Sequence, residues 1–184
     1  FSELYRARQC FVLENELHII YQVTPVYVSS LWPNIDWLSF LNIWESLNED
    51  MKRVAQLVGV EESFIVKALR GIINHKVRQH VKNLAVHQRF YTALALHDLV
   101  HEVPLNTVAR KYGATRGILQ SLQQTAATFA GMVTVFCNRL GWHNLELLVT
   151  QFQDRLHFGI QRELCDLVRL SHVNGQRARE LYNA

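Results

Sequence analysis

The chain has 184 residues, 49% of them apolar, and a formal net charge of +3 at pH 7. This size and apolar content fit one sizeable hydrophobic core and exclude a wholly disordered chain. No apolar run approaches the roughly 20 residues that a membrane-spanning helix needs, so no membrane partner is expected.

Helices are predicted along the whole chain, because prolines are few and no long run alternates apolar and polar residues. Residues 24–34, which hold Pro25 and Pro33, are expected to form a loop. The predicted fold class is all-α, a helical bundle. The predicted helices cover residues 2–22, 36–47, 49–58, 61–70, 78–101, 105–111, 115–140, 144–157 and 160–170, and a last helix begins near Gly175.

Several residues mark where these helices begin and end. Asn48 precedes two acidic residues, which is typical of an N-cap followed by acids in the first turn. Gly59, Gly71 and Gly113 each lie where a predicted helix ends.

The cysteines are odd in number, far apart and without a CxxC pair, which favours a reducing compartment such as the nucleus or cytosol. We expect all of them to be small core residues, namely Cys10, Cys137 and Cys165.

Charge is unevenly distributed along the chain. Residues 1–62 hold four basic residues against nine acidic ones, whereas residues 63–145 hold ten basic residues against Asp98 and Glu102 alone. A solvated helix face is one explanation of the basic stretch. An anionic partner, above all nucleic acid, explains the scarcity of acids better.

The predicted helix over residues 115–140 has an apolar side and a narrow polar side. Its apolar side collects Ile118, Leu119, Leu122, Ala126, Phe129, Val133, Phe136, Cys137 and Leu140. The opposite stripe holds small residues, amides and a hydroxyl, with no charge beyond its first member: Arg116, Gln120, Gln123, Ala127, Gly131, Thr134 and Asn138. Such a stripe suits a nucleic-acid strand that slides, but it equally suits another helix or a protein partner packing against small residues.

Catalytic and metal-binding patterns are weak. His97 and His101 have the i, i+4 spacing of zinc-binding histidines, but Asp98 replaces the usual glutamate and no third ligand follows, so no metal is expected. A phosphate-binding loop is absent, and no catalytic residues are predicted. We therefore expect this chain alone not to be an enzyme.

Residues 105–122 allow an alternative function as a helix-turn-helix module that binds duplex DNA. The start of the second helix, with Thr115, Arg116 and Gln120, would then enter a major groove. The objection is that this helix is predicted to continue to Leu140, far beyond a usual recognition helix.

Several runs of residues resemble a known family. Those in the second half are residues 111–113 (KYG), 119–124 (LQSLQQ), 130–132 (AGM), 138–144 (NRLGWHN) and 158–169 (FGIQRELCDLVR). Those in the first half are residues 11–15 (FVLEN), 23–25 (VTP), 51–55 (MKRVA) and 58–62 (VGVEE). Together they resemble the superfamily-two repair helicases of the theta type, the helicase-like region of DNA polymerase theta, with archaeal repair helicases as more distant relatives.

The resemblance implies part of an ATP-dependent helicase that acts in the nucleus, in double-strand-break repair by microhomology-mediated end joining. Residues 1–170 would form its helical ratchet domain, and residues 171–184 would begin a truncated helix-hairpin-helix piece. A chain that starts without Met agrees with a piece of a longer protein. ATP and Mg would belong to RecA-like domains outside this chain, so no cofactor is expected in it. The implied partners are single-stranded DNA, the remaining helicase domains and, as an option, further copies in a homo-oligomer.

In this family the ratchet helix lies along the translocating strand. The DNA-binding residues implied here are Lys111, Arg116, Gln120, Ser121, Gln123, Gln124, Thr128, Arg177 and Arg179. The basic group from Lys76 to Arg89 is expected to add phosphate contacts. Archaeal members present an Arg and a Trp where this chain has Ser121 and Thr128, so base stacking by that Trp is lost. Asn174 replaces the first glycine of the hairpin, which alters its phosphate-binding turn but leaves Arg177 and Arg179 available.

Overall fold

The computed structural model describes residues 15–27, 32, 34–74 and 76–184. The described part contains helices and no strand, which confirms the all-α fold class. The α-helices are α2 (Glu16–Val23), α4 (Trp37–Ser46), α5 (Glu49–Val58), α6 (Glu62–Leu69), α7 (Arg78–Val100), α8 (Leu105–Tyr112), α9 (Arg116–Arg139), α10 (His143–Phe158) and α11 (Gly175–Asn183). Two short 3-10 helices, η2 (Arg162–Leu164) and η3 (Leu167–Arg169), lie between α10 and α11.

The local signals at the helix ends are confirmed. The Asn48 carboxamide oxygen accepts a hydrogen bond from the Met51 amide at 2.8 Å, so Asn48 caps α5. Gly59 and Gly113 end α5 and α8 with φ of 92° and 62°, a left-handed conformation that disfavours residues with a Cβ. Of the predicted helix 2–22 the structure describes residues 15–22, and it is wrong at Asn15, whose extended backbone caps the start of α2. Part of the loop 24–34 also lies outside the described residues.

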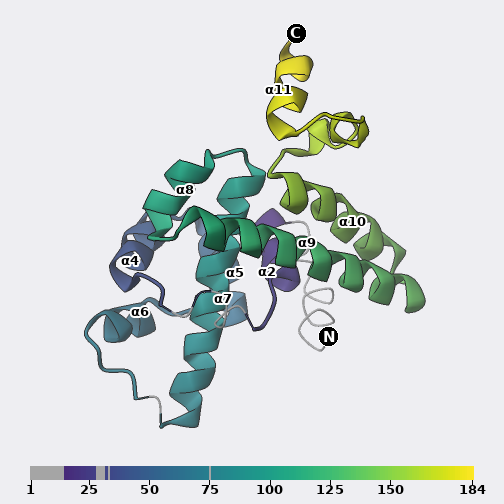
Figure 1. The fold of residues 1–184 in the computed structure, drawn as a ribbon. Coiled ribbons are helices and arrows are strands. Elements are labelled where there is room, and N and C mark those ends of the chain that lie inside the picture. Colours follow the sequence, from purple (N-terminus) through teal and green to yellow (C-terminus); the bar gives the residue numbers. More distant parts are fainter. Residues whose placement is uncertain (1–14, 28–31, 33, 75) are drawn as a thin grey trace.

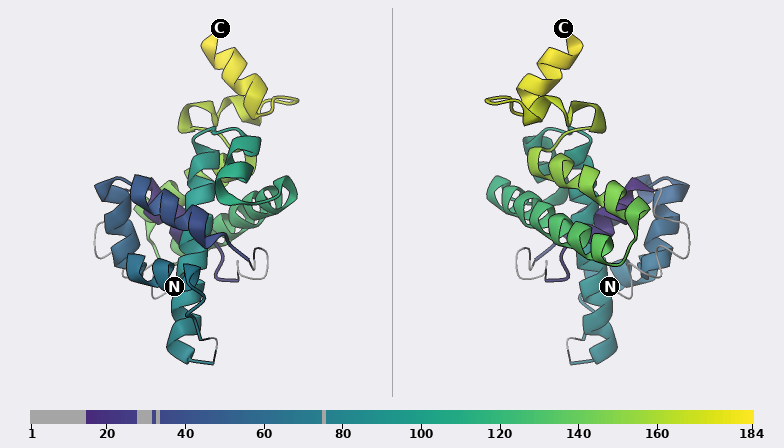
Figure 2. Two further views of the ribbon diagram at one scale, coloured as in Figure 1. Left: turned by 90° about the vertical axis from the view of Figure 1, so that its left-hand side faces the viewer. Right: turned by 90° about the vertical axis from the view of Figure 1, so that its right-hand side faces the viewer.

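α7 is the central helix, and Figure 1 shows the other elements around its second half. Every residue from 87 to 96 is buried, as expected of a helix surrounded by the core. The Tyr91 hydroxyl donates to the Tyr112 carbonyl at 2.9 Å, which ties α7 to the end of α8. The first turns of α7 project beyond the rest of the fold in Figures 1 and 2.

α9 and α10 form a helical hairpin that packs on one side of this core. Beyond α10 the chain enters a small C-terminal segment with its own hydrophobic cluster of Ile160, Leu164, Val168 and Ala178. The cluster joins residues from both sides of the predicted domain boundary at residue 170, and that boundary stays a prediction.

The predicted α-helix over residues 160–170 is wrong. This stretch forms η2 and η3, whose backbone hydrogen bonds join residues three apart, such as Cys165 N to Arg162 O at 3.2 Å. A helical segment this short has little stability of its own, so its tertiary contacts with α11 decide its form.

The cysteine prediction is confirmed for Cys137, which is buried in the main core, while Cys165 is half-buried beside the C-terminal cluster. Cys10 lies outside the described residues. Among the helices that are described, none is both long and apolar enough to cross a membrane.

Candidate nucleic-acid interface

α9 has the apolar side that its sequence predicts. Thr115 caps the helix, because its hydroxyl oxygen accepts a hydrogen bond from the Ile118 amide at 3.2 Å. The buried residues of this side face the core, and they are Leu119, Leu122, Ala126, Val133 and Cys137. Leu140, which was expected on the same side, is instead exposed at the end of the helix.

Most of the polar stripe predicted to face a strand packs against α10 instead. The Gln123 amide donates to the Leu156 carbonyl at 3.4 Å, and the Asn138 amide donates to Glu146 at 2.8 Å. Ala127 is buried, and a Cβ placed on Gly131 would lie 3.3 Å from the Gln153 amide nitrogen. From Gln123 onward, helix packing is therefore the correct interpretation of the stripe, because its small residues let the two helices approach closely.

A different side of α9 faces solvent, and we call it the α9 outer face. It consists of the exposed residues Arg116, Gly117, Gln120, Ser121, Gln124, Thr128, Met132, Val135 and Arg139. Residues 116–139 contain no Asp or Glu, so nothing on α9 itself repels a phosphate. The Thr128 hydroxyl donates to the Gln124 carbonyl at 2.9 Å, which leaves its oxygen lone pairs able to accept another hydrogen bond. This face offers amide, hydroxyl and small side chains to a ligand.

The structure brings five of the expected DNA-binding residues onto this face, namely Arg116, Gln120, Ser121, Gln124 and Thr128. Gln123 is turned toward α10. Phe129 is only partly buried and packs against the core, which agrees with its assignment to the apolar side.

The remaining predicted cations are partly engaged by acids. The Lys111 ammonium lies 2.7 Å from an Asp98 oxygen, so a phosphate contact would compete with this ion pair. Arg179 pairs with Glu102 at the end of α7 and with Glu163 in η2. Two carboxylates therefore already hold the Arg179 guanidinium, so a phosphate would compete with both, and the DNA contact of Arg179 stays a prediction. Arg177 is exposed and donates to the His172 carbonyl at 2.8 Å.

Arg89 is not placed to contact a phosphate. Its guanidinium is buried, donates to the Thr24 carbonyl at 2.7 Å and lies 4.4 Å from the centre of the Tyr21 ring. It therefore joins α7 to the end of α2 and does not face solvent.

A cavity of about 810 Å³ lies where the start of α9, the end of α7 and the C-terminal segment meet. Gln120 and Gln123 line it from α9, and Arg179 lines it from α11. Glu102, Glu163 and Glu180 also line it, so its charge does not favour a phosphate group. Its amides suit an uncharged polar group such as a base edge. Sequence reasoning missed these acids, since Glu102 is 77 residues from its partner Arg179.

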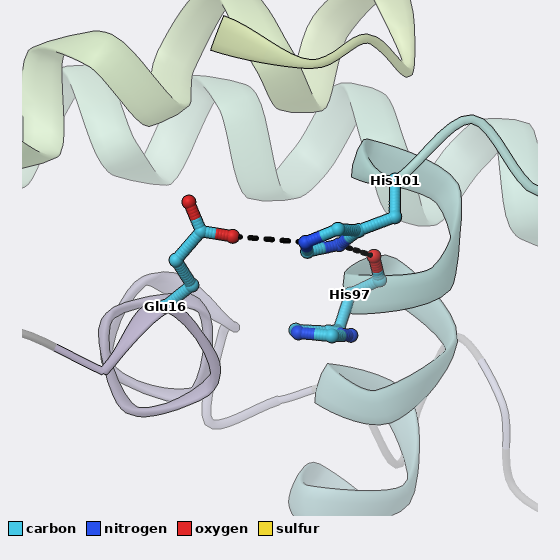
Figure 3. Close-up of side chains that lie close together, drawn as sticks. All are labelled: Glu16, His97 and His101. Atoms are coloured by element: carbon cyan, nitrogen blue, oxygen red, sulfur yellow. Dashed lines mark hydrogen bonds and ion pairs between the residues drawn. The ribbon is translucent and has the colours of Figure 1, made fainter.

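The spaced histidines of α7 do acquire a third neighbour, Glu16 of α2, as Figure 3 shows. His101 Nδ1 donates to the His97 carbonyl at 2.7 Å, and Nε2 lies 3.0 Å from a Glu16 oxygen. The buried Arg155 guanidinium donates a hydrogen bond to the other oxygen of the Glu16 carboxylate at 2.7 Å. The sequence pattern showed no third ligand after these histidines, and it missed Glu16, which precedes them in the sequence and is adjacent in the fold.

Electrostatics favours an ion-pair network here over a metal centre. Hydrogen bonding to His101 lowers the pKa of Glu16 to about 2, aided by Arg155. The hydrogen bond to Glu16 raises the pKa of His101, while burial lowers the pKa of His97 to about 4. A divalent cation would have to share the carboxylate with the Arg155 guanidinium, which repels it. The absence of a metal stays a prediction.

The sequence of this chain is similar to that of known proteins over most or all of its length. Residues 1–156 match the family described as the helical domain of the DNA polymerase Q helicase-like region. DNA polymerase theta of Mus musculus is 57% identical over 183 residues, which are 99% of this chain and 7% of that protein. Helicase POLQ-like of Homo sapiens is 33% identical over 187 residues, covering 100% of this chain and 16% of that protein. The ATP-dependent DNA helicase Hel308 of Methanocaldococcus jannaschii is 26% identical over 97 residues, 53% of this chain and 8% of that protein. The chain thus spans a small part of the length of each relative.

Proposed function

The chain belongs to the family of the helical domain of the DNA polymerase theta helicase-like region, and from this premise we propose that it guides a single DNA strand along the α9 outer face. The strand would be moved by an ATP-dependent helicase that includes this domain and acts in the nucleus, in double-strand-break repair by microhomology-mediated end joining. ATP and Mg would be bound by other domains of the helicase. This domain would contribute positioning and no covalent chemistry.

The observation that carries the proposal is the α9 outer face itself. Arg116–Arg139 contains 24 residues, so α9 is about 36 Å long and can follow several nucleotides. Amides and hydroxyls hydrogen-bond to sugars, bases and phosphates, yet they form no strong ion pair that would hold the strand at one register. A surface of this kind suits a strand that must bind and still move.

A protein-interaction or assembly role is the second candidate, and the far end of the same face favours it. Met132 and Val135 are more than half exposed there, and apolar side chains of that size are typical of protein contacts. A homo-oligomer through this surface would fall within this candidate. The duplex-binding alternative is weaker, because the 24-residue length of α9 bears out the objection to a recognition helix.

The test places one negative charge on the face of the full-length natural protein. Gln120→Glu and Gln124→Glu should each lower the rate of DNA unwinding several-fold, because a carboxylate repels the phosphates of a strand beside it. ATP hydrolysis without DNA should be unchanged. The matched control is Gln56→Glu, an exposed amide on α5 that receives the same change in charge.

Equal losses of unwinding and of DNA-free ATP hydrolysis would show that α9 has a structural role only. Normal unwinding by both α9 variants would mean that the strand does not follow this face. Normal unwinding combined with a changed oligomeric state in size-exclusion chromatography with light scattering would establish the assembly role instead.

A further inference from the structure

The first turns of α7 form a projecting, positively charged arm. We call residues 76–85 the α7 arm, and Figures 1 and 2 show this end of the helix extending beyond its neighbours. Burial of α7 on all sides begins only at His87. Within the arm, Lys76, Arg78 and Lys82 are exposed, and the last two lie one helical turn apart on the same side.

The cations of the arm have no acidic partner in the described part of the chain. The sequence contains no Asp or Glu between Glu62 and Asp98. Among the described residues, ion pairs engage Lys111, Arg155, Arg169 and Arg179, but none involves Lys76, Arg78 or Lys82. Ion pairs thus hold four basic residues of the described chain, while Lys76, Arg78 and Lys82 are exposed and are not among those four.

This arrangement is not the one that stability or solubility would favour. Arg78 occupies the first turn of α7, where the helix dipole disfavours a cation, and no acid accompanies it there. Solubility is served by charges of both signs, whereas the arm carries one sign only, beside the exposed side chains of Val77 and Val81. A ligand with many negative charges would offset the repulsion among these cations.

We propose that the α7 arm is a second nucleic-acid contact, which binds the phosphodiester backbone through Lys76, Arg78 and Lys82. The proposal takes the class of ligand from the proposed function but does not depend on the α9 outer face. The two surfaces have different roles in this proposal. The α9 outer face carries little charge and orients the strand, whereas the arm adds affinity that depends on salt. Flexible lysine and arginine side chains in and just before the first turns of a projecting helix can contact phosphates without reading the base sequence.

The test measures the salt dependence of DNA binding in the full-length natural protein. The probes are a fluorescent single-stranded oligonucleotide and a fluorescent blunt duplex, each titrated at several salt concentrations. The variant is Arg78→Gln combined with Lys82→Gln, since glutamine retains helix propensity and removes the charge. The matched control is Lys52→Gln combined with Arg53→Gln, which removes the same charge from α5.

With the single strand, the slope of log affinity against log salt should become shallower by about 1.4, because each lost phosphate contact contributes about 0.7. The α5 control should keep the wild-type slope. Weakening with the duplex alone would assign the contact to duplex phosphates and still support the arm. The charge-conserving variant Arg78→Lys with Lys82→Arg should keep the affinity and the salt slope of the wild type, because both positive charges are retained.

An unchanged slope with both probes would overturn the proposal and leave an acidic protein as the partner of the arm. An equal change in the α5 control would overturn it too, since net charge alone would then explain the effect. If the arm variant loses slope while Gln120→Glu and Gln124→Glu unwind DNA normally, the arm stands and the α9 proposal fails.

Discussion

Gly131 of α9 lies directly against the side chain of Gln153 on α10, so close that a Cβ at position 131 would be 3.3 Å from the Gln153 amide nitrogen. Together with the hydrogen bond from Asn138 to Glu146, this contact fixes how near the two helices approach. Small residues on α9 therefore allow the close packing of the hairpin, and the DNA contact that we propose lies on the neighbouring side of the helix.

Substitutions at Gly131 should have opposite effects depending on their size. Gly131→Ala should leave the free energy of unfolding unchanged or raise it by up to about 1 kcal/mol, because alanine favours helix and the exposed Gln153 amide can move aside. Gly131→Leu should lower it by about 1–3 kcal/mol, because a large side chain forces α10 away. Urea denaturation followed by circular dichroism measures both. Equal stability of the leucine and alanine variants would show that α9 and α10 are not closely packed at this point.

The network of Glu16, His97, His101 and Arg155 should make stability depend on pH. The pKa of His101 is raised in the folded chain above its ordinary value of 6.5. A histidine of this kind stabilises the fold fully below 6.5, and its contribution disappears as pH rises through the folded pKa. His97 acts in the opposite direction, since its folded pKa of about 4 makes the fold lose stability as pH falls below 6.5.

The two histidines are separated by working in a His97→Gln background. There, adding His101→Gln should lower the free energy of unfolding more at pH 5.5 than at pH 8.5, because the contribution of a histidine with a raised pKa falls as pH rises. Thermal melting at the two pH values measures the difference. A loss that is the same at both values would mean that His101 contributes packing and not charge. Glu16→Gln should remove most of the dependence on His101, since Glu16 is the acid that it faces.

The sequence predicts the helices of this fold well and the surroundings of its polar residues poorly. Asn48, Gly59 and Gly113 mark helix ends through contacts within a few residues, which sequence order records directly. The buried side of α9 also follows from periodicity alone. The side of α9 that meets α10 does not, because glycine, alanine and amides satisfy both a helix neighbour and a nucleic-acid strand.

Long-range ion pairs mark the other limit of sequence reasoning. The sequence predicts Arg179 as a phosphate ligand, but in the fold Glu102, 77 residues earlier, lies beside it. Glu16 is likewise invisible as the neighbour of His101, because no spacing rule connects α2 with the end of α7. Helical periodicity predicts which side of a helix is buried, whereas ion pairs between residues distant in sequence can be identified only in the folded structure.

The ion pairs of Arg179 should hold the C-terminal segment to the body of the domain. Glu102 lies two residues beyond the end of α7 and has a φ of 62°, which is uncommon for a residue with a side chain. Its carboxylate and that of Glu163 both pair with the Arg179 guanidinium. Both acids raise the pKa of Arg179, whose guanidinium is in any case charged at every working pH.

Arg179→Gln should therefore speed amide hydrogen exchange in α11 and in residues 160–170, while exchange in the buried part of α7 stays as in the wild type. High salt should have a similar but smaller effect on the wild type, because the pairs are partly exposed. Arg177→Gln is the matched control, since this exposed neighbour makes a backbone hydrogen bond and no ion pair with a described residue. Equal acceleration in both variants would show that α11 is held by its apolar contacts through Ala178, and that the charge of Arg179 plays no part in holding it.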